Sequence, residues 1–541
     1  MKSPWLVSLA AVLATAPACS TDPSLDDAAP DSSPPRGDSP PGDEGGDEHH
    51  GGDSGDDSDG AGGGGDGAGG GGDGAGQPRA VEVSLVPQTD DVGAERVNFA
   101  LPLARDQLRD PGRIRVVAGD DEIPAYVEAI AWYPDDSIQS AQIQVDVDLD
   151  VHRQLTLDVG AEASAGSLDA VPVSDTLIAA DGTQGPRVLA VLPPSWLAES
   201  GVIGPPPASE PAAGQTLGPW AGVCDYDRYD TSRFLADSGS RGAWLYDRPT
   251  ALFRLHATSG AALPLRDALR EAHIYREAIT GSGRSTRIGV PTAQNDLKYH
   301  YAQGMAIAYL LTGDDRFRRR AEDVADRASD LWVPDYVPGG RFWTERHAGF
   351  ALLTYVWAAR VSYERRDDFT ALADEAVQAH LHQQSTRPPG YGDPDARCFS
   401  YDSGRGYEGC SPWLSAILAD GIAEYAAWRG GERAASARES IVRLGRLFAR
   451  DGIDPSGKPY YWIAGDGSRG EVDPNDEHWG EMAYVIAMAW HYDGRRDDGM
   501  RSAAEGLISG LSSRGVSPHT RSFNWQCRGA PLTPLYLADD A

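Results

Sequence analysis

The spacing of apolar residues changes once along the chain, and this change constrains the fold more than any other feature. From residue 81 to about residue 177, short runs such as VEVSLVP, RIRVVAG and IQSAQIQVDVDLDV alternate apolar with polar side chains. A period of two over several segments predicts antiparallel β-strands. From about residue 251 the apolar period is near 3.6, which predicts helices. We therefore expect an antiparallel β domain over residues 80–177, an extended connector over residues 178–250 and an all-α domain over residues 251–541.

The predicted helices alternate between two kinds. One kind is apolar along almost its whole length, as at residues 304–311, 349–361, 414–428 and 482–490, and the helix that follows each of these is amphipathic. A helix that is apolar on every side has to be buried, whereas an amphipathic helix covers a core with one face. A ring of helical hairpins with buried inner and half-exposed outer helices produces this alternation. The helical domain is therefore expected to be an α/α toroid of helical hairpins.

The first residues have the features of an export signal. Residues 1–19 contain Lys2 near the start, an apolar run, and the small residues APA before Cys19, which resembles the cleavage site of a bacterial lipoprotein. Residues 20–79 are rich in Gly and Asp and contain almost no large apolar side chains, which predicts a disordered linker. We expect a protein of the bacterial cell surface or periplasm that contacts the membrane only through a lipid on Cys19, or otherwise a secreted protein.

The remaining cysteines predict two disulfides. Cys224, Cys398, Cys410 and Cys527 form an even set in a chain with an export signal, and three pairings are possible. We expect Cys398 to pair with Cys410, closing a short loop, and Cys224 with Cys527. No C-x-x-C spacing occurs, so these cysteines are not expected to hold a metal ion.

The charge balance excludes one class of partner. The chain has 48 Lys and Arg residues against 81 Asp and Glu residues, a net charge of -33. Nucleic acids require a basic surface, so a nucleic-acid partner is not expected. An acidic polymer can still bind in a locally basic cleft, because salt screens the more distant charges.

Polar and aromatic residues gather at the N-terminal ends of the apolar helices, at residues 295–301, 343–347, 410–413 and 475–481. The inner helices of a toroid run in one direction, so these four clusters would line one funnel. His300, His347 and His478 hold equivalent positions in three clusters. Capping or packing explains any one such residue, but the coincidence of three indicates a site. By contrast, His380 and His382 fall in an outer helix, where a solvated helix end is expected.

The β domain resembles that of a known family. The segments RVNFALPLARDQLRD and EAIAWYPDDSIQSAQIQVDVDL are similar to a strand and a hairpin of the β-barrel domain that precedes the catalytic toroid in rhamnogalacturonan-lyase-like proteins. Ala100 and Asp136 stand at two positions where that family has glycine. The resemblance implies a polysaccharide-lyase-like protein with the same order of domains.

The clusters contain the residue types that cleavage of an acidic polysaccharide by β-elimination needs. A cation neutralises the uronate carboxylate, a base removes the proton from the adjacent carbon, and an acid protonates the leaving oxygen. Toroid lyases use a similar set of Asn, His, Tyr and Arg. The catalytic candidates are His347, Tyr301, Arg346 and Asn295, with His300 and His478 as substitutes. The candidates for substrate binding are Lys298, Tyr299, Trp343, Glu345, Trp413, Glu477, Trp479 and Tyr401. The assignment of base and acid stays open, and no cofactor or metal ion is expected.

Two other functions fit the same residues. A glycoside hydrolase in this fold needs two carboxylates, for which Glu345, Asp476, Glu477 and Glu481 are candidates, with Glu345 and Glu477 paired across the ring. A noncatalytic glycan-binding lipoprotein would use the aromatic residues alone. Three results would distinguish these functions. A rise in ultraviolet absorbance indicates a lyase, reducing ends without that rise indicate a hydrolase, and retention on a glycan gel without any product indicates a binding protein.

Overall fold

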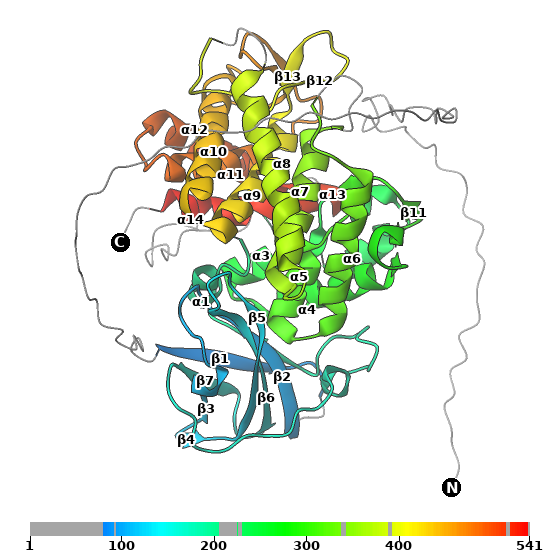
Figure 1. The fold of residues 1–541 in the computed structure, drawn as a ribbon, viewed down its shortest axis with the longest axis vertical. Coiled ribbons are helices and arrows are strands. Elements are labelled where there is room, and N and C mark those ends of the chain that lie inside the picture. Colours follow the sequence, from blue (N-terminus) through cyan, green and yellow to red (C-terminus); the bar gives the residue numbers. More distant parts are fainter. Residues whose placement is uncertain are drawn as a thin grey trace, which may run out of the picture. The chain divides into compact units, whose positions relative to one another are not determined.

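The computed structural model describes residues 79–90, 93–204, 224, 230–336, 342–387, 392–514 and 520–538. The predicted signal segment, Cys19 and all but the last residue of the predicted linker lie outside these residues. Within them, the chain combines antiparallel β-sheets with helices, as the change of period predicts (Figure 1). None of the described helices has the length and apolar character needed to cross a membrane.

Two antiparallel sheets form the N-terminal part. One has the strand order β4-β3-β7-β1-β8, and the other the order β2-β6-β5. Their strands are β1 (Arg79–Pro87), β2 (Ala94–Pro102), β3 (Ile114–Ala118), β4 (Asp121–Glu122), β5 (Ala125–Trp132), β6 (Ile138–Asp148), β7 (Gln154–Val159) and β8 (Val188–Val191). The register pairs Val81 with Leu157 and Val97 with Val145, and these apolar side chains enter the core. The predicted alternation has its expected result in the first sheet, where buried and exposed side chains alternate along β1, whereas β2 and β6 of the second sheet are buried on both faces over most of their length.

The hairpin between β5 and β6 is built by its own side chains. The Asp135 carboxylate accepts hydrogen bonds from the backbone amide and the hydroxyl of Ser137. Asp136 takes a φ of 62°, the left-handed conformation that glycine adopts most easily. Aspartate tolerates this conformation better than most residues, so the turn forms without glycine.

The segment predicted as an extended connector belongs partly to the β region. β8 lies within residues 178–250 and completes the first sheet by pairing with β1. Two short helices, α1 (Pro194–Ser200) and α2 (Thr231–Asp237), follow it. The four-residue run VLAV is too short to show a period, which is why its sequence does not reveal a strand.

Six helices make a closed series of contacts. They are α3 (Arg248–Ser259), α5 (Gln303–Thr312), α7 (Glu345–Val361), α9 (Pro412–Arg429), α11 (Trp479–Tyr492) and α13 (Thr520–Gly529). Each packs against the next, and α13 packs against α3. Five further helices alternate with them: α4 (Ala262–Glu277), α6 (Asp315–Leu331), α8 (Arg366–Thr386), α10 (Gly431–Asp451) and α12 (Asp498–Arg514). A short helix, α14 (Thr533–Leu537), packs on α11.

Local sequence explains the start and end of these helices. Gly313, at φ 72°, ends α5, and the Asp314 side chain caps α6 by accepting from the Arg316 amide. Thr344 caps α7 in the same way. One turn further along α7, a Cβ atom on Gly349 would lie 2.6 Å from the backbone of Ile417. The glycine therefore allows α7 and α9 to approach closely.

A network of buried charged side chains joins four of the six helices, α3, α7, α9 and α13. Arg254 donates to Asp420 over 2.9 Å, and Arg528 donates to the same carboxylate over 2.8 Å. Arg360 donates to Glu424 over 3.0 Å, and all five side chains are buried. Removing one partner from such a network leaves an uncompensated buried charge, so it fixes how the helices pack.

Both disulfides have the predicted pairing. Cys398 is bonded to Cys410, and Cys224 to Cys527, 303 residues further along the chain. The loop that the Cys398–Cys410 disulfide closes contains two strands, β12 (Tyr401–Asp402) and β13 (Glu408–Cys410). They form a small sheet with β14 (Tyr460–Ala464) and β15 (Gly470–Val472). A second small sheet contains β9 (Ile279–Thr280), β10 (Arg287–Gly289) and β11 (Ala293–Gln294).

One expectation about an outer helix is wrong. His380 is fully buried in α8, where the Tyr336 hydroxyl contacts its Nδ1 atom over 2.8 Å. Only His382 is exposed. The two residues lie two positions apart on a helix and therefore face different directions, so they do not share an environment.

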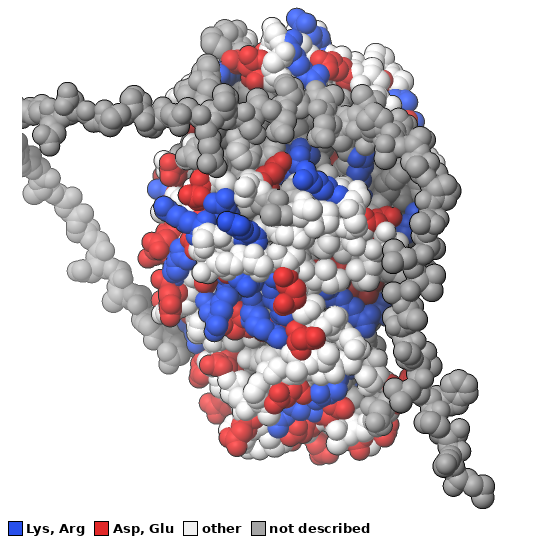
Figure 2. Space-filling model, turned by 90° about the vertical axis from the view of Figure 1, so that its right-hand side faces the viewer, with Lys and Arg blue, Asp and Glu red and all other residues white. Residues whose placement is uncertain are grey.

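Acidic and basic side chains are interspersed on the face shown in Figure 2. Along α6, for example, Arg318 pairs with Asp315 and Arg327 with Asp330. Exposed pairs of this kind contribute little to stability. They do neutralise the arginines locally, so the basic residues of α6 do not form an anion-binding surface.

Candidate functional site

The starts of α7, α9 and α11 meet around Trp413. Arg346 is the second residue of α7, Trp413 is the second residue of α9, and His478 immediately precedes α11. The guanidinium carbon of Arg346 lies 5.6 Å from the centre of the Trp413 ring. The His478 ring stacks on Trp413 with ring centres 4.2 Å apart and planes 5° from parallel. Three of the four predicted clusters thus each place one side chain here.

Arg346 is a cation without an acidic partner. Its Nη1 atom donates to the Tyr246 hydroxyl over 2.5 Å, and its guanidinium lies 5.6 Å from the Tyr246 ring centre. It forms no ion pair with the residues that the structure describes, and its buried Nε atom has no hydrogen-bond partner there. Burial acts to lower the pKa of Arg346, but the Tyr246 hydroxyl and Asp296 raise it above its ordinary value. The side chain therefore stays charged and is free to bind an anion.

Tyr246 completes the surroundings of Arg346 from the start of α3. Its ring lies edge-on to Trp413 and to Trp525, and burial holds its pKa well above the ordinary value, so it stays a neutral phenol. Tyr246 has a φ of 74° and His478 a φ of 57°. Left-handed conformations are uncommon for a bulky residue such as tyrosine, and strained positions of this kind tend to gather at functional sites.

His478 is held with one ring nitrogen available. Its Nδ1 atom contacts a carboxylate oxygen of Glu481 over 3.2 Å. Trp525 and Tyr461 flank the ring at centroid distances of 5.1 Å and 6.1 Å. Its Nε2 atom makes no hydrogen bond with a described residue. A carboxylate on Nδ1 orients the imidazole and favours the tautomer whose Nε2 accepts a proton.

Tyr461 is the second group with an available polar atom. It lies on β14, half-buried, and its hydroxyl bonds to none of the described side chains or backbone groups. Its ring centre is 5.8 Å from that of Trp413 and 5.9 Å from the guanidinium carbon of Arg405. Burial raises the pKa of Tyr461 although Arg346 and Arg405 act to lower it. The hydroxyl therefore keeps its proton at neutral pH and is able to donate it.

His347 and Tyr301, the first catalytic candidates, have their polar atoms occupied. The two ring nitrogens of His347 contact Asp296 over 2.9 Å and Thr344 over 2.6 Å. The Tyr301 hydroxyl donates to the Trp244 carbonyl over 2.9 Å and accepts from the Tyr246 amide. These contacts leave neither side chain with a free atom for a substrate.

His300 and Asn295 also lie away from Arg346. His300 is fully buried, with its Nδ1 atom 3.0 Å from the Asp296 carbonyl, and burial lowers its pKa to about 4. Asn295 is exposed, and its side-chain oxygen accepts a hydrogen bond from Arg327 of α6. The structure therefore does not bring these two residues to the groups around Trp413.

The candidates for substrate binding separate into accessible and buried residues. Lys298 is half-buried and pairs with Asp296 over 3.1 Å. Trp343 is half-buried, and its ring lies edge-on to His347 at 5.0 Å. Tyr299 is buried, and Trp479 is buried against Arg514 of α12. Lys298 and Trp343 are thus the two of these four that solvent reaches.

The carboxylates of the hydrolysis hypothesis are mostly engaged. Glu345 is fully buried beside Tyr401, which is buried too. Asp476 pairs with Lys458 over 3.0 Å. Glu481 contacts His478, as described above. Each of these three carboxylates, like Glu477, still has one buried oxygen without a hydrogen-bond partner among the described residues.

Glu477 keeps one oxygen without a partner. Its Oε1 atom accepts from the Ser522 hydroxyl over 3.3 Å, and its buried Oε2 atom bonds to no described group. Burial raises the pKa of Glu477, and the charges of Asp473 and Glu481 add to this effect while His478 opposes it. A carboxyl group in such surroundings is suited to donating a proton.

Sequence reasoning missed three members of the site: Tyr246, Tyr461 and Trp525. A signal existed for Tyr246, because the run Tyr246-Asp247-Arg248-Pro249 has a capping aspartate and an early proline before an apolar helix. The other clusters likewise have polar and aromatic residues at the start of an apolar helix. No local signal marks Tyr461 or Trp525, which reach the site from distant segments.

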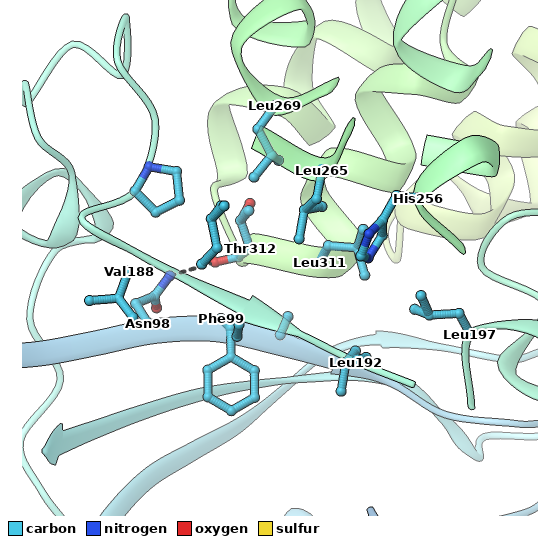
Figure 3. Close-up of a pocket in the computed structure, with 14 residues that line it drawn as sticks. Asn98, Phe99, Val188, Leu192, Leu197, His256, Leu265, Leu269, Leu311 and Thr312 are labelled. Carbon is cyan, nitrogen blue, oxygen red and sulfur yellow. Dashed lines mark hydrogen bonds between the residues drawn. The ribbon is translucent and has the colours of Figure 1, made fainter. Parts of the chain in front are cut away.

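A separate hollow lies between the β-sheets and the helices. Figure 3 shows it between β2, β8 and the helices α3 to α5, with Asn98 donating to the Thr312 carbonyl over 2.8 Å. Leucine, valine and alanine side chains form most of its lining. Its histidine, His256, is neutral because burial lowers its pKa to about 4. Among the described residues that line the hollow there is no carboxylate or arginine.

No metal centre is evident around Trp413. Within the described part of the chain, no group of three or more His, Cys, Asp or Glu side chains is arranged to hold a metal ion.

Comparisons with known proteins find distant structural likenesses, which include the following two. No protein-family model and no curated protein matches the sequence. A solved structure titled polysaccharide lyase has 12% sequence identity and a TM-score of 0.41, and the match covers 58% of this chain and 97% of the other. A glycosyl hydrolase of family 88 from Bacteroides vulgatus has 12% identity, a TM-score of 0.39 and the same coverage of both chains. Such low scores assign no activity, so the function is argued from the site.

Proposed function

We propose that this protein is an exported carbohydrate-active enzyme that cleaves a uronate-containing polysaccharide by β-elimination. The observation that carries the proposal is Arg346, which is charged, bonded to a neutral phenol and unpaired with any described carboxylate. Buried cations are normally paired, because removing them from water is costly. A carboxylate of the substrate supplies the missing partner.

The surroundings of Arg346 supply the other two groups that elimination needs. With the uronate carboxylate on Arg346, the proton on the neighbouring carbon becomes more acidic. His478 Nε2 takes this proton, and the electrons of the C–H bond form a carbon–carbon double bond while the bond to the leaving oxygen breaks. Tyr461 donates its phenolic proton to that oxygen. The product is an unsaturated uronate and a new chain end.

The helical arrangement supports an α/α toroid as the fold of this enzyme. The contact series of α3, α5, α7, α9, α11 and α13 closes on itself. The starts of three of these helices meet at Trp413, which is the geometry that a ring of parallel inner helices produces. The positive ends of their dipoles add to the attraction for an anion.

Hydrolysis is the second candidate, and one observation favours it. Glu477 has an orphan oxygen and a raised pKa, which suit a general acid. The predicted partner, Glu345, is fully buried and bonded to Ser411, so it does not face a substrate. Elimination is favoured because its three groups lie together without Glu345.

The two disulfides support export, because such bonds persist in oxidising compartments. A lipid on Cys19 at the end of an acidic linker would hold the enzyme at a membrane surface. This part of the proposal rests on the sequence alone. Mass spectrometry of the purified native protein after release of its N-terminal peptide tests it directly.

The test of the activity is incubation with pectins, alginate, glycosaminoglycans and ulvan. Elimination creates a double bond conjugated to the carboxylate, so ultraviolet absorbance rises on one of these polymers. His478→Ala should abolish the rise while the polymer still binds. Reducing ends without absorbance would instead assign hydrolysis through Glu477. Retention of a glycan without any product would make this a binding protein and would contradict the proposal.

A further inference from the structure

Glu345 lies directly beside the proposed carboxylate site without facing it. It is the first residue of α7 and is fully buried. Its Oε1 atom accepts a hydrogen bond from the Ser411 amide over 2.8 Å and lies 3.3 Å from the Ser415 hydroxyl, which donates to it. Ser411 immediately precedes α9. One carboxyl group therefore joins the starts of α7 and α9.

This link acts on the closest helix pair of the site. Glu345 and Gly349 are four residues apart and so lie on the same face of α7, which is turned toward α9. At Gly349 the absence of a side chain lets the two backbones approach. Glu345 holds the same two helices together one turn nearer to the N-terminus of α7.

The link also sets the position of two side chains that bind or frame the substrate. Arg346 follows Glu345 on α7, and Trp413 follows Ser411 by two residues on α9. The Arg346 guanidinium lies over the Trp413 ring at 5.6 Å. Since Arg346 has no acidic partner, its position depends on Trp413 and Tyr246. A shift between the helix starts would move Trp413 away from the guanidinium.

The surroundings of Glu345 make its charge responsive to pH. Burial raises its pKa to about 7 against the effect of the Ser411 amide and the Tyr401 hydroxyl. Tyr401 and Tyr336 face it as neutral phenols whose pKa values are well above the ordinary value, and His380, next to Tyr336, is neutral because burial lowers its pKa to about 3. The Oε2 atom of Glu345 has no hydrogen-bond partner among the described residues. The carboxyl group thus gains or loses a proton near neutral pH without a neighbouring countercharge.

We infer that Glu345 is a positioning residue, which ties the start of α9 to the start of α7 and thereby keeps Trp413 over the substrate-binding guanidinium of Arg346. The inference rests on the proposed function of Arg346 as the carboxylate ligand. The ionised carboxyl group is the stronger acceptor for the Ser411 amide. The enzyme therefore binds its acidic substrate best above neutral pH, where this hydrogen bond is strongest.

Three variants test the role. Glu345→Ala removes the link and should raise KM about tenfold with a smaller change in kcat, since about 1.4 kcal/mol is a tenfold change. Glu345→Gln keeps an oxygen acceptor and should recover KM to within about threefold of wild type. Leu352→Ala is the control, because Leu352 contacts Gly421 at the same helix interface but further from Arg346. It should lower stability and leave KM unchanged.

The pH profile separates positioning from a purely structural role. Wild-type KM should rise as pH falls through neutrality, whereas KM of Glu345→Gln should stay flat because an amide does not titrate. The inference is wrong if Glu345→Gln keeps the wild-type profile, or if Glu345→Ala and Leu352→Ala raise KM equally.

A readout without substrate keeps this result apart from the proposed function. The difference in tryptophan fluorescence between wild type and Trp413→Phe should titrate near neutral pH. The same difference measured in a Glu345→Gln background should not. If no polysaccharide is cleaved but this titration is present, the proposed function fails and the link between Glu345 and Trp413 stands. If the titration is missing from the wild-type protein, the positioning role is refuted.

Discussion

Replacing Arg346 with methionine should remove substrate binding without weakening the fold. The variant keeps a long side chain and loses the charge. In the folded protein it loses one hydrogen bond to Tyr246 and two cation–π contacts, at 5.6 Å from Tyr246 and 5.6 Å from Trp413. The hydrogen bond is worth about 1.5–3 kcal/mol and each cation–π contact about 0.5–1 kcal/mol.

The same substitution removes a partly desolvated cation that interacts with the charge of Asp296 but forms no ion pair with a described carboxylate. The desolvation of a buried ion costs several kcal/mol, which is similar to the sum of the lost contacts. The free energy of unfolding of Arg346→Met should therefore lie within about 1 kcal/mol of wild type. Binding of a uronate loses a forked, charge-assisted pair of hydrogen bonds worth about 3–4 kcal/mol, so kcat/KM should fall by roughly 10²- to 10³-fold.

Arg254→Met is the matched control. Arg254 is fully buried, whereas Arg346 is half-buried, and Arg254 pairs with Asp420 over 2.9 Å and donates to the Ile203 and Arg528 carbonyls. Its loss should lower the free energy of unfolding by about 3–5 kcal/mol, because the buried Asp420 carboxylate loses one of its two cations and two buried carbonyls lose their donor. Chemical denaturation and initial rates on the acidic polysaccharide measure both quantities. The reasoning is refuted if Arg346→Met unfolds as easily as Arg254→Met, or if it cleaves the polymer as wild type does.

The remaining predictions concern proton transfer and pH. Tyr461→Phe should lower kcat by about 10²-fold with little change in KM. The control is Tyr407→Phe, which should leave kcat and KM unchanged because the Tyr407 hydroxyl is bonded to Glu471. Equal effects of the two substitutions would show that Tyr461 is not the acid. His347→Ala should lower the free energy of unfolding by about 2 kcal/mol and retain measurable turnover, and a stable but inactive variant would place His347 on the substrate. Burial lowers the pKa of His300 to about 4 and of His380 to about 3, so their contribution to stability is present above the unfolded-state value and is lost as pH falls toward the folded values. At pH 5 the free energy of unfolding should be lower by roughly 2 kcal/mol for each histidine. Denaturation curves that do not change between neutral pH and pH 5 would contradict this prediction.

The sequence predicts the architecture well where a period extends over many residues. Alternation marks the long strands of the two N-terminal sheets, and the succession of apolar and amphipathic segments marks α5 to α12. Short elements leave no such signal. β12 and β13 have two and three residues, and they form a sheet only with β14, which lies about fifty residues further along the chain. Their pairing depends on long-range contacts that no local pattern records.

The site is predictable to the level of the cluster but not of the side chain. Arg346 and His347 are adjacent in sequence, yet consecutive residues on a helix point about 100° apart, so only one of them faces Trp413. The other turns to Asp296 and becomes part of the packing. Tyr461 has no cluster of its own and reaches the site through β14. The residue types therefore indicate the chemistry, while the helix faces decide which residues perform it.

The most direct test of the account is a crystal structure of His478→Ala with an oligosaccharide of the acidic polysaccharide that wild type cleaves. The account predicts a uronate carboxylate within hydrogen-bonding distance of the Arg346 guanidinium, with its neighbouring carbon toward position 478 and the glycosidic oxygen toward the Tyr461 hydroxyl. An oligosaccharide bound elsewhere, or bound with its carboxylate on another cation and Arg346 uncontacted, would contradict the central claim.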